Sequence, residues 1–571
     1  MGIRVAVQDE AIKPYDKRHK MSLIPSSLPT SAIGSMDFNL QDYTVTISED
    51  GLSKLAMSGA VLGNGIVQLI DGSWFYRPFD PLGRVPAIVS KTVEFPPNGA
   101  IVTHTYTGLL SAKVVYTYTI SGNDVHISAH VSNTGTKPLQ PAFTSMSFLR
   151  ATGGTYINLG YDQSHTQNNS DIYYPGSNVP YAAAAWAGVP STALGAPQIN
   201  LASWSEEDPY EKFMQLLFFH STYPGISMGS IFFNDVPPGG SRVYKWAYRF
   251  QNSTDWKDLL GGYKTSLRAV FPTIAYEPDA RPLAQFTSIH ASYIRPDNPY
   301  GYNDGGSVAN CVPGKLCRRF DTQVGTDNFV SQLVPAMTAT NYQGIVLWQP
   351  QGIHPRGVQY RPDFNVFPPE TIPNLPTLTS GFRNAGLSIG LLSRSSVTVT
   401  SSTWTTDSTT RLTDHSGSID DLKGRLQWAL SNNFNAFYLD SFVGIGVDHK
   451  ILRVMRDMVG FNVHLFTEHS TALSMAFAAS YEQISSWNAG ISLTQKQQIL
   501  RWIWPESIIA AKFTGALPPG GYAELYQAMF DLKLTPWIED HRAQVAPAPG
   551  NENGILQPLV ASRIGPDGRW L

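Results

Sequence analysis

The segment Asn433-Phe-Asn-Ala-Phe-Tyr-Leu-Asp440 is a short run of apolar and aromatic residues that ends in a carboxylate. Such a run, without polar alternation, is typical of a strand buried on both faces, as in a parallel sheet. A second run of the same kind, Asn462-Val-His-Leu-Phe-Thr-Glu468, ends 28 residues further on (468 − 440 = 28). The two runs therefore indicate neighbouring strands of consecutive β/α units.

Runs of this type recur from residue 284 to the end of the chain, with helix-like segments between them. The helix-like segments are 418–430, for which we expect Ser418 as N-cap and Asp421 as its capping-box partner, 449–458 and 522–530. The eight runs that we interpret as strands are 284–289, 344–348, 387–392, 436–439, 463–466, 481–484, 508–513 and 534–538. Eight β/α repeats over roughly 300 residues predict a (β/α)8 TIM barrel. A doubly wound open sheet is the alternative, but no G-x-G-x-x-G follows a strand to support it.

The first half of the chain indicates a different architecture. Segments 112–120, 125–131 and 142–149 are rich in β-branched and aromatic residues, and turn sequences such as Ser121-Gly-Asn-Asp separate them. Short strands at this spacing predict an N-terminal antiparallel β-sandwich, a pattern that persists to about residue 250. The composition changes near residues 273–282. We therefore expect two domains, a β-sandwich over 1–275 and a catalytic barrel over 276–571.

Composition limits the classes of function. Of 571 residues, 42% are hydrophobic and only 15% are charged, with a net charge of −3, so the chain is neither disordered nor suited to binding nucleic acid. No stretch approaches the roughly 20 apolar residues of a membrane span. The two cysteines, Cys311 and Cys317, flank a Pro-Gly turn that would let a disulfide close. This pair favours an extracellular or cell-surface location, although the N-terminus has no apolar signal core.

Functional groups of such a barrel lie where its strands end, at the carboxyl face. The residues expected there are His290, Tyr293, Arg295, Trp348, Arg394, Asp440, Glu468, His469, Trp487, Glu539, Asp540 and His541. Taken singly, many have a structural alternative: a strand-end Asp can cap the next helix, a Trp can belong to the core, and an Arg can pair with a carboxylate. His290, His469 and His541 form no H-x-x-x-H or H-E-x-x-H motif, so no metal site and no cofactor are expected.

Asp440 and Glu468 form the most specific pair in this set. Two carboxylates at the ends of adjacent strands suit glycoside hydrolysis, in which one group attacks or stabilises the anomeric carbon and the other transfers a proton. Trp348, Arg394, Tyr293 and Asp540 would then line the sugar subsite, together with His290, His469, Trp487, Glu539 and His541. The expected partner is an oligo- or polysaccharide.

Two segments carry a resemblance to a known family. Ala385-Gly-Leu-Ser-Ile-Gly-Leu-Leu, followed by the segment that ends at Asp440, resembles the third and fourth barrel strands of the α-galactosidase-like (clan D) glycoside hydrolases. The region from Asn123 to Leu139 resembles their N-terminal galactose-mutarotase-like supersandwich. This resemblance implies that Asp440 is the nucleophile of a retaining mechanism.

The chain departs from that family at the acid/base. Those enzymes carry it as an Asp after the sixth strand, where this sequence has no convincing Asp. In having a Glu after the fifth strand, the chain is similar to α-amylase-like enzymes and endo-α-N-acetylgalactosaminidases, which carry their acid/base there. This resemblance implies that Glu468 is the acid/base. We therefore expect a secreted, polysaccharide-degrading glycosidase that cleaves α-linked bonds with retention. An inverting, β-specific or furanose-specific glycosidase, a transglycosylase and a non-catalytic carbohydrate-binding protein are the alternatives.

Overall fold

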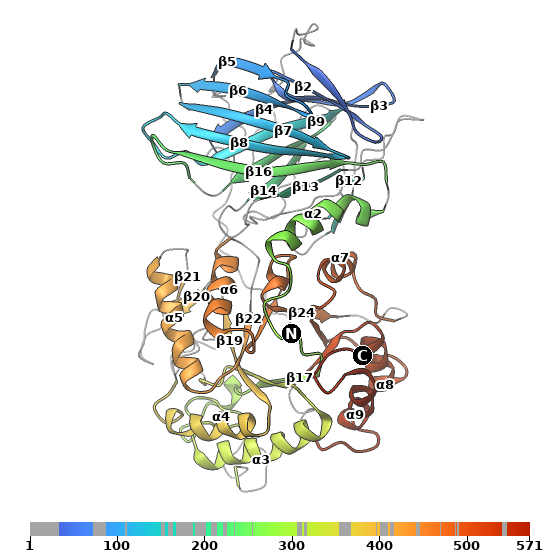
Figure 1. Cartoon of the computed structure of the whole chain (residues 1–571). Coiled ribbons are helices and arrows are strands. Elements are labelled where there is room, and N and C mark those ends of the chain that lie inside the picture. Colours follow the sequence, from blue (N-terminus) through green and yellow to red (C-terminus); the bar gives the residue numbers. More distant parts are fainter. Residues whose placement is uncertain are drawn as a thin grey trace, which may run out of the picture.

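The structure is a computed structural model of the whole chain. It describes residues 34–571 apart from 72–86, 109–110, 150–154, 158–163, 167–186, 189–200, 207–213, 221–224, 233–234, 254, 305–310, 313–316, 353–366, 395–396, 400–408, 412–415, 441–445, 469, 486, 488–489 and 540–544. Figure 1 shows an all-β part above and an α/β part below, with helix α2 (Trp256–Val270) between them.

The N-terminal part contains two antiparallel sheets. One has seven strands in the order β1 (Met36–Asn39), β2 (Thr44–Ser48), β3 (Gly51–Met57), β4 (Ala60–Asp71), β9 (Pro141–Leu149), β15 (Gly225–Phe232) and β14 (Met214–His220). The other has six, in the order β13 (Leu201–Ser205), β16 (Ser241–Phe250), β8 (Asp124–Asn133), β7 (Ala112–Ser121), β6 (Gly99–Thr107) and β5 (Ala87–Glu94). A small third sheet contains β10 (Thr155–Ile157), β11 (Ser164–Thr166) and β12 (Ala187–Gly188). The expected N-terminal sandwich is confirmed.

The sandwich core lies between the two large sheets. Strand β7 alternates buried and more exposed residues along much of its length, as expected when one face of a strand packs inward. Phe143 of one sheet stacks on Trp246 of the other, with ring centroids 4.9 Å apart. Large aromatic rings therefore fill much of the space between the sheets, which accounts for part of the high aromatic content.

Helix α2 joins the sandwich to the barrel. Its buried residues include Leu260 and Tyr263, which pack in the same core cluster as Trp204 of β13 and the barrel interior. On the barrel side, the Lys264 ammonium donates to the backbone oxygen of Trp502 at 2.7 Å, and Arg268 pairs with Glu506 at 2.5 Å. The helix thus packs against both parts of the molecule.

The C-terminal part is a closed barrel of eight parallel strands. They are β17 (Leu283–Thr287), β18 (Gly344–Trp348), β19 (Ser388–Arg394), β22 (Ala436–Asp440), β23 (His464–Glu468), β24 (Ala479–Ile484), β25 (Ile509–Phe513) and β26 (Thr535–Glu539). Pairing of β17 with both β18 and β26 closes the barrel. All eight predicted strands are present, so the expected barrel is confirmed and the open sheet is excluded.

Helices and short elements surround these strands. The α-helices are α3 (Gln323–Thr340), α4 (Leu375–Asn384), α5 (Ser416–Ser431), α6 (Gly446–Val459), α7 (Gln495–Ile503), α8 (Gly521–Asp531) and α9 (Glu552–Arg563). The short elements are η1 (Ala291–Tyr293), η3 (Ile372–Asn374), η4 (Ser474–Ala476) and the hairpin of β20 (Val397–Val399) with β21 (Thr409–Arg411). The three predicted helices are present as α5, α6 and α8. The predicted cap Ser418 is wrong, because α5 already begins at Ser416 and Ser418 lies inside its first turn.

Aromatic side chains pack together inside the barrel. Tyr438 contacts Trp348, Tyr481 and Trp537, with ring centroids 5.7, 5.0 and 5.4 Å apart. The indole N–H of Trp537 donates to the side-chain oxygen of Gln285 at 2.7 Å. These contacts place one residue each of β17, β18, β22, β24 and β26 in the interior of the barrel.

Candidate active site

The two predicted catalytic carboxylates end neighbouring strands. Leu439 of β22 is the register partner of Thr467 of β23, so the next residues along the two strands, Asp440 and Glu468, lie side by side. The Cα atoms of neighbouring strands are about 5 Å apart. Asp440 is only 9% exposed, whereas Glu468 is partly exposed. The structure therefore brings this pair together at the carboxyl end of the barrel.

Both residues belong to the inward-facing set of their strands. Tyr438 and Phe466 contact Trp537 inside the barrel, and they are register partners of each other. Side chains alternate along a strand, so Asp440 and Glu468, each two residues further on, face the same side as Tyr438 and Phe466. The two carboxylates thus stand above an aromatic layer that closes the barrel below them.

Trp348 and Arg394 end the strands on the other side of Asp440. Trp348 is the last residue of β18, and its partly buried ring packs on Tyr438. Arg394 is the last residue of β19 and the register partner of Asp440. The backbone thus places Arg394 beside Asp440, and the side chain of Arg394 is not among those that the structure describes.

The remaining strand-end candidates are described less completely. Glu539 is the last residue of β26 and the register partner of Gln285, but its side chain is not among those described. Predicted residues His469, Asp540 and His541 lie outside the described part of the chain. Trp487 follows the end of β24 by three residues and packs partly buried against the barrel core.

His290 and Tyr293 lie on the long loop that follows β17. The backbone N–H of His290 donates to Gly301 at 2.9 Å, and its Nδ1 lies 2.6 Å from the Ser292 hydroxyl. The rings of His290 and Tyr293 meet edge to face, with centroids 5.7 Å apart. His290 is exposed and Tyr293 is partly exposed, so both are available at the surface of this loop.

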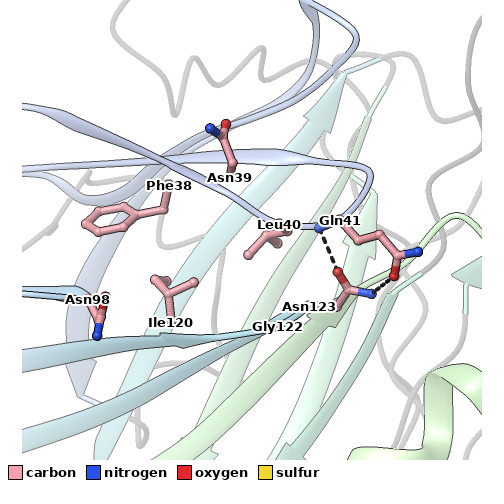
Figure 2. Close-up of a pocket in the computed structure, with 8 residues that line it drawn as sticks. All are labelled: Phe38, Asn39, Leu40, Gln41, Asn98, Ile120, Gly122 and Asn123. Atoms are coloured by element: carbon pink, nitrogen blue, oxygen red, sulfur yellow. Dashed lines mark hydrogen bonds between the residues drawn. The ribbon is translucent and has the colours of Figure 1, made fainter.

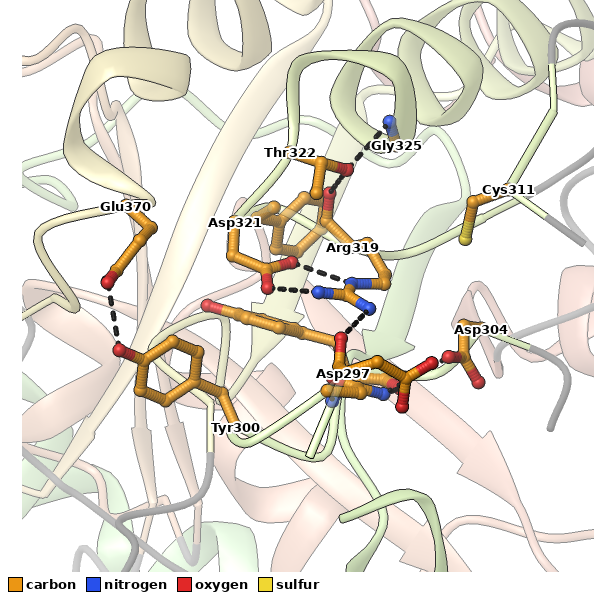
Figure 3. A network of polar contacts seen from close by, with 12 residues as sticks. Asp297, Tyr300, Asp304, Cys311, Arg319, Asp321, Thr322, Gly325 and Glu370 are labelled. Atoms are coloured by element: carbon orange, nitrogen blue, oxygen red, sulfur yellow. Dashed lines mark hydrogen bonds and ion pairs between the residues drawn. The ribbon is translucent and has the colours of Figure 1, made fainter. Parts of the chain in front are cut away.

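Ion pairs and a disulfide hold this loop in shape (Figure 3). Arg319 forms a two-pronged ion pair with Asp321, and its Nη1 donates to the backbone oxygen of Asp297 at 2.7 Å. Arg295 pairs with Asp304 and with Asp297, so it has a structural role within the loop. The expected disulfide between Cys311 and Cys317 is present, with Cα atoms 5.1 Å apart.

The same loop is anchored to the loop after β18. The buried hydroxyl of Tyr302 donates to the backbone oxygen of Pro350 at 2.8 Å, and the hydroxyl of Tyr300 donates to Glu370 at 2.9 Å. Asn374 in turn donates to the backbone oxygen of Phe320 at 2.9 Å. These bonds join the loop after β17 to the loop after β18. His290 and Tyr293 therefore lie on a loop whose conformation is stabilised by its neighbour.

Sequence reasoning missed two polar residues near the barrel mouth, of which Lys512 is buried and Gln483 is exposed. Lys512 of β25 and Gln483 of β24 are register partners. Each lies two residues beyond an interior position of its strand, since Tyr481 contacts Tyr438 and is the register partner of Ala510. Alternation therefore directs both toward the barrel mouth. The signal that could have found them is their position along the strand, two residues beyond an inward-facing residue, whereas the candidates expected from the sequence all lie at or beyond the strand ends.

Lys512 is the more informative of the two because it is a cation only 9% exposed. A buried ammonium is retained only where negative or polar groups compensate its desolvation. Asp440, Glu468 and Lys512 thus give the mouth two potential proton carriers and a positive charge. Such an arrangement can supply a nucleophile, a proton donor and electrostatic stabilisation to one reaction centre.

Comparison with known proteins identifies the fold. The sequence matches no protein-family model and no curated protein. Among solved structures, an α-N-acetylgalactosaminidase from Bifidobacterium bifidum is similar with a TM-score of 0.53 at 11% identity, over 92% of this chain and 92% of that one. A GH36 α-galactosidase from Geobacillus stearothermophilus gives a TM-score of 0.51 at 11% identity, over 92% of this chain and 86% of that one. The chain therefore has the sandwich-and-barrel fold of these GH36-like structures, as the sequence resemblance implies.

Among the described residues, no helix combines the length and the apolar character needed to cross a bilayer.

Proposed function

We propose that the chain is a glycoside hydrolase that cleaves α-linked glycosidic bonds with retention. The observation that carries the proposal is the side-by-side placement of Asp440 and Glu468 at the carboxyl face of the barrel. Retaining glycosidases need two carboxyl groups about 5–5.5 Å apart, because one attacks the anomeric carbon while the other protonates the leaving oxygen. Carboxylates on adjacent strands can meet this requirement.

Asp440 is the proposed nucleophile. It ends a strand that is buried along its length, so its main chain is fixed by pairing on both sides. A buried carboxylate on a rigid strand can be held close to one face of the bound sugar. Attack of its oxygen on the anomeric carbon would form a glycosyl-enzyme ester as the glycosidic C–O bond breaks.

Glu468 is the proposed acid/base. It would donate its proton to the departing glycosidic oxygen and then take a proton from the water that cleaves the ester. Its partial exposure gives water a route to the second step.

Other predicted residues would bind the sugar. Trp348 offers an aromatic ring at the carboxyl end of the barrel, while His290 and Tyr293 lie on the loop after β17. Arg394, Trp487, Glu539, Asp540, His541 and His469 complete the proposed sugar-binding set. The similar enzymes supply the first substrates to test, because their names specify α-galactosides and α-N-acetylgalactosaminides, and the GH36 α-galactosidase is known in complexes with stachyose and raffinose.

We also propose that the protein works in an oxidising compartment such as the cell exterior. The disulfide between Cys311 and Cys317 supports this, since disulfides persist mainly outside the reducing cytosol. The bond closes within the loop that carries His290 and Tyr293. Loss of this disulfide would therefore affect the part of the proposed sugar-binding site that His290 and Tyr293 form.

The test is sugar release from a panel of aryl α- and β-glycosides and from raffinose and stachyose. We expect the wild type to release sugar from α-glycosides, and Asp440→Asn to lose at least about 1,000-fold in rate while its circular dichroism is unchanged. The exposed Asp457→Asn change on α6 is the matched control and should keep full activity. Equal activity of Asp440→Asn and the wild type would contradict the proposal, as would release from β-glycosides alone.

A further inference from the structure

A second concave site lies in the sandwich, away from the barrel mouth. It is a cavity of about 580 Å³, and Figure 2 shows its lining. The residues that line it are Phe38, Asn39, Leu40, Gln41, Asn98, Ile120, Gly122 and Asn123. They come from edge strand β1 and the turn after it, and from the end of strand β7 and two turns at one end of the six-stranded sheet. The cavity thus opens where the two sheets of the sandwich meet at an edge.

The lining has an unusual composition for a surface cavity. Four of its eight residues are amides, Asn39, Gln41, Asn98 and Asn123, and none carries a charge. The two nearest carboxylates in the sequence, Asp37 within β1 and Asp42 after it, have other partners: Asp37 accepts from the Thr46 hydroxyl at 2.5 Å, and Asp42 accepts from the backbone N–H of Asn252 at 3.2 Å. The cavity therefore offers no charge to attract an ion.

Hydrogen bonds at the rim hold the side-chain amides of Asn123 and Gln41 together and fix the backbone of Asn98. Asn123 accepts from the backbone N–H of Gln41 at 2.8 Å and donates to the side-chain oxygen of Gln41 at 3.2 Å, which joins the two sheets. Asn98 has a positive φ of 61°, and its backbone oxygen accepts from the N–H of Ile120 at 3.0 Å. Because an amide offers two donor hydrogens and two acceptor lone pairs, these groups retain further hydrogen-bonding capacity.

Apolar groups form the rest of the lining. Phe38 and Ile120 are partly buried against the sandwich core, and Figure 2 shows them at the end of the cavity away from Gln41 and Asn123. Fixed amides that both donate and accept suit vicinal hydroxyl groups, and an aromatic ring suits the apolar C–H face of a pyranose. A neutral sugar presents these two features together.

We infer that this cavity is a carbohydrate-binding site for a neutral sugar unit of a glycan chain. Anionic ligands such as phosphates or uronates find no cation in the lining. A purely apolar ligand would leave the amides without partners, which is unfavourable. The site is separate from the proposed catalytic centre: its residues fall between 38 and 123, whereas the mouth residues follow barrel strands. It would keep a polymeric substrate attached while the barrel acts on it.

The experiment is affinity electrophoresis in gels that contain galactomannan, arabinogalactan or dextran, with polygalacturonate as the anionic comparison. The Asp440→Asn protein is used so that the polymer is not cut. We expect at least one neutral polysaccharide to retard it. Adding Phe38→Ala should weaken this binding at least about tenfold, since one aromatic contact and its packing are lost. Adding Met36→Ala, an exposed position of the same strand outside the lining, should not.

A second variant guards against a folding defect. Asn98→Gly removes an amide at a positive-φ position that glycine accepts without strain, so it should weaken binding while the melting temperature is retained. Retardation of the Phe38→Ala and Asn98→Gly proteins equal to that of the control would overturn the inference. Retardation by polygalacturonate alone, or by none of the polymers, would overturn it as well.

Failure of this site and failure of the proposed catalysis give different results. With Asp440 intact, Phe38→Ala should keep wild-type rates on small aryl glycosides, because these substrates do not reach the sandwich. Binding without any hydrolysis would leave the cavity confirmed and the catalytic proposal wrong.

Discussion

Asp440 and Glu468 lie side by side at the ends of β22 and β23, one position beyond the register pair of Leu439 and Thr467. This relationship depends on main-chain pairing between two parallel strands rather than on loop conformation. Strand ends in a closed barrel are among the most rigid positions that a protein offers. The proposed chemistry therefore rests on the best-fixed part of the site, while the long loops supply the sugar contacts.

The positive charge of Lys512 should contribute to catalytic activity. Replacement by Met keeps most of the side-chain volume but removes the positive charge at the mouth. We expect Lys512→Met to lower kcat/KM about 10- to 100-fold, the range for loss of a charged hydrogen bond. The matched control, Lys423→Met on the exposed surface of α5, should leave kcat/KM unchanged. Unchanged kinetics for Lys512→Met would assign this residue a purely structural role.

The disulfide should stabilise the first βα loop. Cys311 and Cys317 are six residues apart, and closing so short a loop stabilises by about 2 kcal/mol in the chain-entropy account. Reduction with dithiothreitol is expected to lower the melting temperature of the wild type and to raise KM, because His290 and Tyr293 are on the same loop. A protein with both cysteines replaced by serine should start at the lower values and show no response to the reductant.

Gly262 in α2 should be irreplaceable at the junction between sandwich and barrel. A Cβ atom there would lie 2.4 Å from a ring atom of Trp204, which is buried. Gly262→Ala is expected to destabilise by about 1–3 kcal/mol through overpacking. Gly424 in α5 has nothing within 4 Å of its added Cβ, so Gly424→Ala should instead stabilise by up to about 1 kcal/mol through helix propensity. Urea denaturation distinguishes the two, and similar effects of both changes would contradict the packing at α2.

Glu552 should make stability depend on pH. Burial raises the pKa of this carboxyl from 4.5 to about 8 in the folded protein, and the Tyr526 hydroxyl donates to it. Between these values the folded state binds more protons than the unfolded state. The free energy of unfolding from this group should therefore fall as pH rises from 4.5, by up to about 1.4 kcal/mol per pH unit, and level off above pH 8.

Urea denaturation at several pH values between 5 and 9 checks this dependence. Glu552→Gln removes the titrating group and should flatten the fall in stability across that range. Glu524→Gln, on the exposed face of the adjoining helix α8, is the control and should leave the fall in place. An identical pH profile for Glu552→Gln and the wild type would show that this carboxyl does not titrate as described.

Much of the barrel could be predicted because its strands are buried on both faces. Segments such as 436–439 and 344–348 are nearly continuous apolar runs, and the observed β22 and β18 match them within a residue. Helix α2 was not predicted, because Gly261 and Gly262 interrupt its helical pattern. The tertiary contact of Gly262 with Trp204 explains that glycine, and a contact between distant residues leaves no local signal.

The site residues likewise divide into those that the sequence predicts and those that only the fold reveals. Asp440 and Glu468 are found from sequence because a carboxylate ends each apolar run. Lys512 instead lies within its apolar run, Ile509-Ala-Ala-Lys-Phe513, where the sequence alone does not distinguish it from any other polar residue of a strand. Only the pairing of Ala510, two residues before Lys512, with the interior Tyr481 shows that Lys512 belongs with the inward-facing positions. The amide-lined cavity of the sandwich joins residues 82 positions apart, Gln41 and Asn123, and therefore needs the fold to be recognised.

The most direct test of the account is the configuration of the product that Glu468→Ala forms from an activated aryl α-glycoside in sodium azide. Azide needs no general base, so it should attack the ester on Asp440 from the opposite face. We predict that azide raises the turnover of this variant at least about tenfold and yields the α-glycosyl azide, as retention through Asp440 requires. A β-glycosyl azide, or no effect of azide on turnover, would contradict the assignment of nucleophile and acid/base.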